Sequence, residues 1–173
     1  MTIYKGKRFE GEKFDSFDLS AVDFTDTLLI DCQFWNCNLS NSIIAGARLQ
    51  GVKFVDSKLV GLNFSKINPF LLKVELRDCL VSSCIFTDLD LSLTDFENSV
   101  IRDCFFGDCN LAKAKFEGTE LNGTSFERND LRGASFVGAR EYGINPSNNK
   151  LKGAKFTYPE ALLLLKYLGV IVE

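Results

Sequence analysis

Histidine is absent from this sequence of 173 residues, which removes the side chain that most often serves as a general base or a metal ligand. Neither sign of charge predominates, because 20 basic residues offset 23 acidic ones and leave a net charge of −3. So small an excess does not indicate nucleic-acid binding or attraction to a membrane surface. No apolar run approaches the length of a bilayer-spanning helix.

The segment 1–5 also lacks the apolar run of a secretion signal, so we expect a cytoplasmic chain without membrane association. A Gly-rich phosphate loop is missing, and the many Ser and Thr hydroxyls have no partner base. The sequence therefore predicts a protein that is not an enzyme and needs no cofactor.

A strict repeat of five residues dominates what is present. Every fifth residue from Phe9 to Phe64, and again from Leu71 to Phe136, is Phe, Leu, Ile or Val. This period fits neither an α-helix nor a flat strand. It predicts a chain that turns a corner every five residues and buries one large side chain on each side. The position two residues earlier is mostly Ala, Cys, Ser, Thr or Val, and predicts a second, smaller inward side chain.

A longer period sets the number of sides. Phenylalanine recurs on alternate repeats, as in Phe96, Phe106 and Phe116, while aliphatic residues such as Ile101 and Leu111 occupy the repeats between them. With four sides to a coil, each side carries the same type of residue in every coil, whereas with three sides phenylalanine and aliphatic residues would alternate on each side. A complete coil therefore has twenty residues, and stacked coils rise by about 4.8 Å each. The inside is predicted to be a packed core and not a pore.

Three stretches contain Asp or Asn followed by Leu, as in the known motif A-[D/N]-L-x-x: Ser16–Ser20, Cys109–Lys113 and Asn129–Gly133. Over about residues 7–138 the pattern resembles the pentapeptide repeat family. The resemblance implies an all-β, right-handed quadrilateral β-helix, which agrees with the count of sides. We assign this solenoid to residues 1–156. Lys7 and Glu12, at small inward positions, predict that the first repeats are frayed or incomplete.

One interruption divides the series. The spacing from Phe64 to Leu71 is seven, and Ile67-Asn68-Pro69-Phe70 is predicted to carry the two extra residues in a turn near 65–70. This slip is either a tolerated bulge at a corner or a small protruding contact loop.

The six cysteines all fall on the small inward position: Cys32, Cys37, Cys79, Cys84, Cys104 and Cys109. Cysteine is a compact apolar filler at such a site. Stacked cysteines would have parallel Cβ vectors that suit a disulfide poorly, and neither histidine nor a CxxC pair is present for a metal site. We therefore expect buried free thiols.

Residues 157–173 form a different unit. Thr157 is predicted to cap a helix that begins with Pro159 and Glu160 and ends at Gly169, followed by a short strand, Val170–Val172. Four consecutive leucines make the helix too apolar for one core face to bury. It either only covers the last coil or also forms a homodimer. The predicted dimer residues are Leu162, Leu164, Leu165, Leu168, Val170, Ile171 and Val172.

The C-terminal region from Glu141-Tyr142-Gly143 onward resembles the module of the microcin-immunity type of pentapeptide repeat protein. That resemblance implies a dimer that protects DNA gyrase, or topoisomerase IV, from poisons such as quinolones or microcin by imitating duplex DNA. Residues 86–130 hold ten acidic and four basic side chains. The candidate partner surface consists of Asp88, Asp95, Glu97, Asp108, Glu117 and Glu127. The alternative is a general protein-interaction scaffold with another partner.

Overall fold

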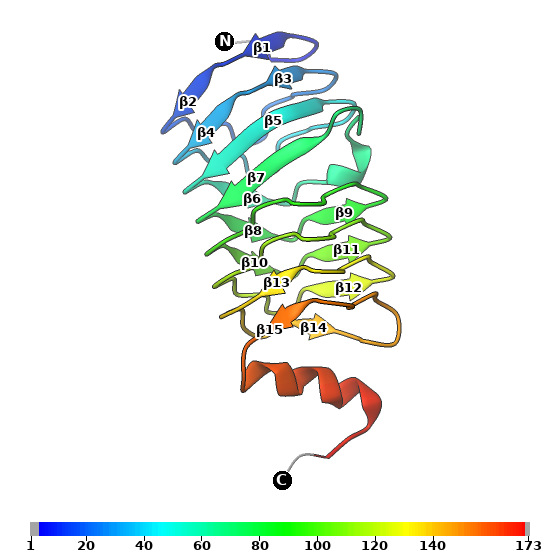
Figure 1. Ribbon diagram of the computed structural model, residues 1–173. Helices are drawn as coiled ribbons and strands as arrows, with labels where there is room; N and C mark the ends of the chain where they lie inside the picture. Colours follow the sequence, from blue (N-terminus) through cyan, green and yellow to red (C-terminus); the bar gives the residue numbers. More distant parts are fainter. Residues whose placement is uncertain (1–3, 172–173) are drawn as a thin grey trace.

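The chain forms a four-sided β-solenoid of about seven turns with one helix at its C-terminal end (Figure 1). The computed structural model describes residues 4–171. Each coil pairs in parallel with the next, so that Phe14 lies beside Phe34 and Phe34 beside Phe54. This register of twenty residues confirms the right-handed quadrilateral β-helix.

The strands are short because the chain turns a corner about every five residues. They pair only in parallel, in four sheets with the orders β1-β3-β5-β4-β2 with β7 on β5, β10-β8-β6, β14-β12-β11-β9 and β13-β15. The strands and helices are β1 (Arg8–Glu10), β2 (Lys13–Asp15), β3 (Leu28–Ile30), β4 (Gln33–Trp35), β5 (Arg48–Val55), β6 (Lys58–Val60), η1 (Phe64–Lys66), β7 (Lys73–Arg77), β8 (Leu80–Ser82), β9 (Ile85–Thr87), β10 (Val100–Arg102), β11 (Phe105–Gly107), β12 (Ser125–Glu127), β13 (Ser135–Phe136), β14 (Gly143–Ile144), β15 (Lys155–Phe156) and η2 (Glu160–Leu168).

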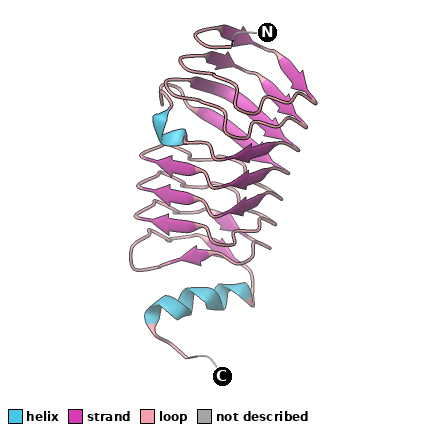
Figure 2. Cartoon of the chain, turned by 180° about the vertical axis from the view of Figure 1, so that it is seen from behind, coloured by secondary structure: helices cyan, strands magenta, loops and turns pink. Residues whose placement is uncertain are grey.

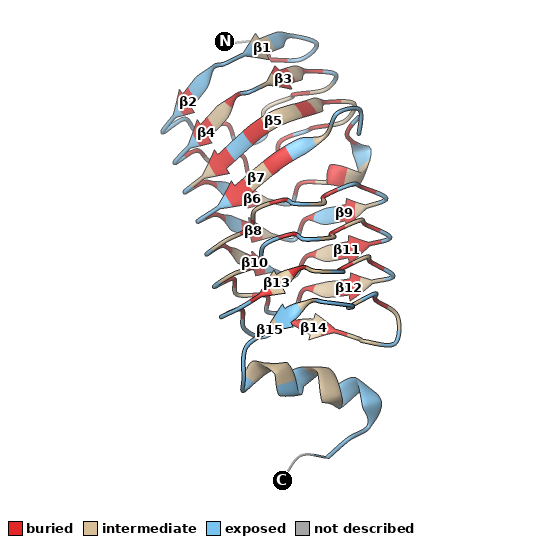
Figure 3. Cartoon of the chain, viewed as in Figure 1, coloured by how far each residue is buried: buried red, intermediate tan, exposed pale blue. Residues whose placement is uncertain are grey.

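Two stacks of phenylalanine rings fill the interior from opposite sides. Within a stack, rings one coil apart lie nearly parallel with centroids 4.5–5.1 Å apart. Between the stacks, Phe96 meets Phe106 edge to face at 5.9 Å. The quadrupoles of the aromatic rings favour both arrangements. The alternation of Phe and aliphatic sides in the sequence therefore corresponds to separate stacks in the core. Buried residues recur along the strands of every coil (Figure 3).

Side chains at the small inward position also form hydrogen bonds with backbone N–H and carbonyl groups at the corners. Ser99 donates its hydroxyl to the carbonyl of Leu76 at 2.8 Å and accepts the N–H of Cys79 at 3.0 Å. Thr124 makes the same pair of contacts, with Ile101 and Cys104. A buried N–H without a partner is costly, so the preference for Ser and Thr at this position has an electrostatic reason as well as a steric one.

All six cysteines are buried and free, as predicted. Burial raises the pKa of the Cys79 thiol from 9.0 to about 12 and that of Cys109 to about 11. Ellman's reagent should therefore react with none of the six thiols in the native protein and with all six in guanidinium chloride. Rapid modification of any thiol in the folded state would contradict the structure.

The same thiols make the fold sensitive to alkali. Above about pH 9 the unfolded chain loses the protons of Cys79 and Cys109, whereas the folded chain keeps them up to its raised pKa values. The folded state then binds more protons than the unfolded state, so the free energy of unfolding should fall as pH rises from 9 to 11. Urea titrations at these pH values measure the fall, and variants with Ser at both positions should show less of it.

The corners require a backbone with positive φ, which favours glycine, asparagine and aspartate. Eighteen described residues other than glycine have a positive φ, and ten of them are Asp or Asn. Two are leucine, Leu71 (φ 56°) and Leu93 (φ 61°). The recurring outward Asp and Asn are thus largely a property of the turn.

The slip differs from its prediction. Leu71 does not resume the series of core residues, because it occupies a corner and is 65% exposed, while Leu72 packs against the core. The extra residues lie at Leu72 and Lys73, just after the corner and not at 67–70. They are absorbed where β5 and β7 pair, because the register shifts between Gln50 and Val52. Proline at 69 cannot supply the large inward side chain, so the chain runs outward there.

The first coil is formed and not frayed. Strand β1 pairs with β3 from Arg8 to Glu10, and the ring of Tyr4 is buried against Phe24 with centroids 4.8 Å apart. Lys7 and Glu12 are exposed because the terminal coil has no neighbour above it to enclose these positions. Their polarity agrees with this exposure.

Candidate interaction surfaces

Helix η2 lies across the last coil, beyond strands β14 and β15 (Figure 2). Leu164 packs against the core, and the helix contacts β14. Beneath it, the rings of Tyr142 and Phe156 close the aromatic stacks with centroids 5.4 Å apart. The helix therefore covers the end of the solenoid, which would otherwise expose an apolar interior.

The ends of this helix agree only partly with expectation. Gly169 terminates it with a left-handed backbone (φ 68°), as predicted. Thr157 does not cap it, because its Oγ1 accepts the N–H of Gly138 at 2.9 Å and holds the last coil instead. Val170 and Ile171 form no strand, since the helix has carried the chain away from any sheet edge. Val172 lies outside the described residues.

The predicted dimer residues fall into two groups. Leu164 and Leu165 are half-buried, whereas Leu162, Leu168, Val170 and Ile171 are exposed. The exposed fraction reaches 55% at Leu168 and 85% at Ile171. Exposed apolar side chains gathered at one end of a molecule are typical of an association surface.

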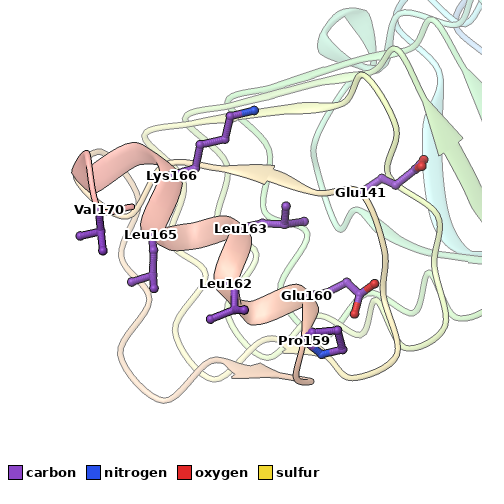
Figure 4. Close-up of a pocket in the computed structure, with 8 residues that line it drawn as sticks. All are labelled: Glu141, Pro159, Glu160, Leu162, Leu163, Leu165, Lys166 and Val170. Atoms are coloured by element: carbon purple, nitrogen blue, oxygen red, sulfur yellow. The ribbon is translucent and has the colours of Figure 1, made fainter. Parts of the chain in front are cut away.

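A groove of about 470 Å³ follows this surface. Leu162 and Leu165 of helix η2 line one side of it together with Val170, which follows the helix, and Glu141 from the last coil lies across from Glu160 (Figure 4). Its lining is mostly apolar, with a carboxylate on each side and Lys166 nearby. Such a lining suits an apolar helix more than a small polar substrate.

The candidate acidic residues do not form one surface. Asp95, Glu97 and Glu117 lie on the face whose core residues are Phe96 and Phe116. Asp88, Asp108 and Glu127 lie on or beside the opposite face, whose core residues are Phe86, Phe106 and Phe126. A partner that reads one face of the rod meets only half of the set.

Basic side chains also neutralise part of this charge. Arg77 contacts Glu97 at 2.8 Å and Asp95 at 3.7 Å. On the other face, the Arg128 guanidinium donates two hydrogen bonds to Asp108, at 2.8 and 2.7 Å, and so lowers the pKa of that carboxyl. Surface pairs of this kind add little stability, but they reduce the field that a cationic partner would sense.

The sequence offered no explanation for one buried polar group. The Asn129 side chain accepts the N–H of Cys109 at 2.9 Å and donates to the carbonyl of Phe106 at 2.9 Å. Asn149, one coil later, repeats this by accepting the N–H of Asn129 and donating to Phe126. The spacing of twenty between the two asparagines is the signal that could have revealed this ladder.

Within residues 4–171, no helix is long and apolar enough to cross a membrane. Over the same range, no cluster of three or more acidic or cysteine side chains is arranged to hold a metal ion.

The comparisons with known proteins agree on the repeat. The family model described as pentapeptide repeats matches in eight copies at residues 18–56 and 109–140. No curated protein matches the sequence.

Solved structures match over nearly the whole chain, at low identity. A trypsin-treated variant of QnrB1, a plasmid-mediated fluoroquinolone resistance protein, matches with a TM-score of 0.55 and 18% identity over 98% of this chain and 92% of that one. HetL of the cyanobacterium Nostoc, a pentapeptide repeat protein involved in heterocyst differentiation regulation, matches with a TM-score of 0.44 and 17% identity over 88% and 86%. The two matched segments lie on either side of the slip, and parallel pairing continues between them, 22 residues apart at Lys58 and Leu80 and twenty apart at Phe105 and Ser125; within these segments the chain is similar to pentapeptide repeat proteins.

Proposed function

We propose that this chain is a pentapeptide repeat protein and a non-enzymatic binding protein of the cytoplasm. In this proposal it dimerises through helix η2, occupies the DNA-binding surface of DNA gyrase or topoisomerase IV, and protects the enzyme from inhibitors such as quinolones or microcin. The fluoroquinolone resistance of QnrB1, which has the same fold, supports this choice of partner.

The observation that carries the proposal is the charge density of the middle of the rod. Residues 86–130 have a net charge of −6 over nine repeats, which is about 11 Å of axis at the usual strand spacing. Duplex DNA carries one charge per ~1.7 Å, or about six over this length. A rod of stacked coils with this density can enter a basic groove that is shaped for DNA.

Gyrase supercoiling in the presence of a quinolone tests the proposal. Micromolar protein should restore supercoiling, and the effect should weaken as salt rises, because charge attraction is screened. A variant with Asn or Gln at Asp95, Glu97 and Glu117 should lose more protection than the matched variant at Asp88, Asp108 and Glu127. On the second face the carboxylate of Asp108 is held by a bidentate arginine, Arg128, whereas no ion pair of Glu117 is found among the described residues of the first face. If micromolar protein neither rescued nor inhibited supercoiling, the proposal would be refuted.

The dimer can be tested separately. Leu168→Asp with Ile171→Asp should raise the dimer dissociation constant at least about a hundredfold, because two exposed apolar contacts would become buried charges. Analytical ultracentrifugation measures the change. Because neither side chain is buried in the protomer, the variant should keep its thermal unfolding profile at high dilution. Leu164→Asp is a poorer probe, since Leu164 packs against the core. An unchanged dimer would refute this interface.

One observation favours the second candidate, a scaffold for another protein. The acids are divided between two faces and are partly paired with arginine, whereas imitation of DNA favours a continuous stripe. Supercoiling that is unaffected by a folded dimer would select this candidate.

A further inference from the structure

One side of the rod is uncharged on its outer surface. Its middle is built from η1 and strands β9 and β11, which follow one another down the solenoid (Figure 1). On the four coils from Ile44 to Phe106, the two residues that flank each buried residue of this side face outward, and none of them is charged. On the opposite side, every coil from Phe54 to Phe116 has a basic or acidic residue at these positions. The first of these sides is referred to as the uncharged face.

The uncharged face is apolar and flat. Ile43 and Ile85 are 51% and 41% exposed. The ring of Phe105 lies along the surface over Gly107, where an added Cβ would come within 2.6 Å of the ring. Below the surface, buried rings one coil apart differ in orientation by only 3–14°, so the coils of this side are scarcely rotated relative to one another. A flat surface without charge can pack closely against another such surface, because no charged group has to be desolvated.

Charged residues follow one edge of this face in an order that is complementary to its own reverse. From the first coil onward the edge residues are Asp26, Gly46, Lys66, Asp88, Asp108 and Arg128. When this order is reversed, each acidic residue meets a basic or a neutral one. Arg128 is already bound to Asp108, whereas over the described residues no ion pair is recorded for Asp26, Lys66 or Asp88, and all three are exposed.

A second copy of the chain, turned end for end, provides this reversed order. The two-fold axis would pass between η1 and β9, at right angles to the rod. Lys66 then lies opposite Asp88 of the partner subunit, and Asp26 lies opposite Arg128 of the partner subunit. By symmetry each of these pairs occurs twice, as in any isologous contact.

The same axis matches the outer surfaces of the two faces. Ile43 comes opposite Phe105 of the partner subunit, so that exposed apolar side chains meet. Ala45 comes opposite Gly107 of the partner subunit, and the small size of both leaves room for the larger neighbours. The complementarity of charge at the edge therefore coincides with complementarity of the apolar surface.

Other arrangements of the two copies bring like charges together. Moving the axis by half a coil in one direction places Lys66 opposite Lys66 of the partner subunit, and moving it in the other direction does the same for Asp88. A parallel pair of rods places Asp108 beside Asp103 of the partner subunit. Like charges that face one another across an interface disfavour it, so the edge residues select one register.

We propose that the uncharged face binds the same face of a second copy, in antiparallel orientation, about a two-fold axis between η1 and β9. This contact is separate from that of helix η2 and does not depend on the proposed binding of gyrase. In such a pair the opposite faces, which carry Asp95, Glu97 and Glu117, both remain outward.

A charge-exchange experiment tests the pairing. Lys66→Glu and Asp88→Lys are made separately in a full chain that also carries Leu168→Asp with Ile171→Asp, so that the η2 contact does not contribute. The parent chain should dimerise with concentration in sedimentation velocity. Each single variant brings like charges together twice, so its dissociation constant should rise at least about tenfold. An equimolar mixture of the two variants should recover the dimer, because every edge contact in the mixed pair again joins an acid to a base. Asp56→Lys, the same change at an exposed left-handed corner away from this face, is the matched control and should leave the dimer unchanged.

The apolar part of the contact is tested in the same parent chain. Ile43→Glu should raise the dissociation constant at least about tenfold, whereas Val137→Glu, at a 45% exposed position on the opposite side, should not. The proposal is overturned if the parent remains monomeric up to about 1 mM, as it would if the face served a different protein. It is also overturned if the mixture dimerises no better than its components, or if a control variant weakens the dimer as much as its counterpart does.

Discussion

Replacing Phe106 by alanine is expected to lower the free energy of unfolding by about 3–5 kcal/mol. The ring is completely buried, stacks on Phe86 at 4.5 Å and on Phe126 at 5.0 Å, and meets Phe96 edge to face. The coils above and below are held by parallel pairing with β11, so they cannot collapse into the space that the ring leaves. A cavity therefore remains, with the loss of contacts from several rings.

Urea denaturation followed by tryptophan fluorescence and circular dichroism measures this loss. Phe17→Ala is the matched control. Phe17 is also an aromatic residue within the repeats, but it is 49% exposed and meets the ring of Phe14 edge to face. It should cost less than about 1 kcal/mol. If the two substitutions had similar effects, the rings would not form the continuous core described above.

The second large effect is expected at Asn129. Leucine at this position should destabilise the fold by about 2–3 kcal/mol, because the buried N–H of Cys109 would lose its only recorded partner, Asn129 Oδ1. The size of a leucine side chain is not expected to destabilise the fold, since Leu89 occupies the equivalent inward position two coils earlier and is buried there. The loss would therefore report on hydrogen bonding and not on packing.

Asn129→Thr separates these two causes. At the equivalent position on the neighbouring side, Thr124 both accepts the N–H of Cys104 and donates to the carbonyl of Ile101. Threonine at 129 should keep the same two contacts and cost less than about 1 kcal/mol, apart from the bond to Asn149. Equal destabilisation by leucine and threonine, measured by urea denaturation, would show that the polar ladder does not stabilise the solenoid.

Neither large prediction concerns a candidate interaction surface. In a solenoid each coil contacts only its neighbours, so substitutions on an outward face leave the interior stacks intact. Variants of Leu168 and Ile171 should consequently affect association without unfolding the rod. The contrast between inward and outward substitutions makes the proposed functions testable one at a time.

The five-residue spacing alone was sufficient to predict the interior. Only one large side chain fits on each side of each coil, so phenylalanines such as Phe96 and Phe116 recur every twenty residues and stack. The type of residue and its spacing are therefore enough to predict the core of the solenoid. The burial of all six thiols followed from the same geometry. These features are local and periodic, and they require no knowledge of distant contacts.

Only the tertiary structure decided where the period fails and what becomes exposed. The extra residues of the slip lie at Leu72–Lys73 because pairing between β5 and β7 absorbs the shift there, and this placed Leu71 outside the core. Which acids pair with arginine, and which of them share a face, depends on coils that are distant in the chain. The C-terminal residues up to Ile171 form no strand because no sheet edge lies within their reach. A repeat specifies its own interior, whereas its interruptions and its outer surface depend on the neighbouring coils.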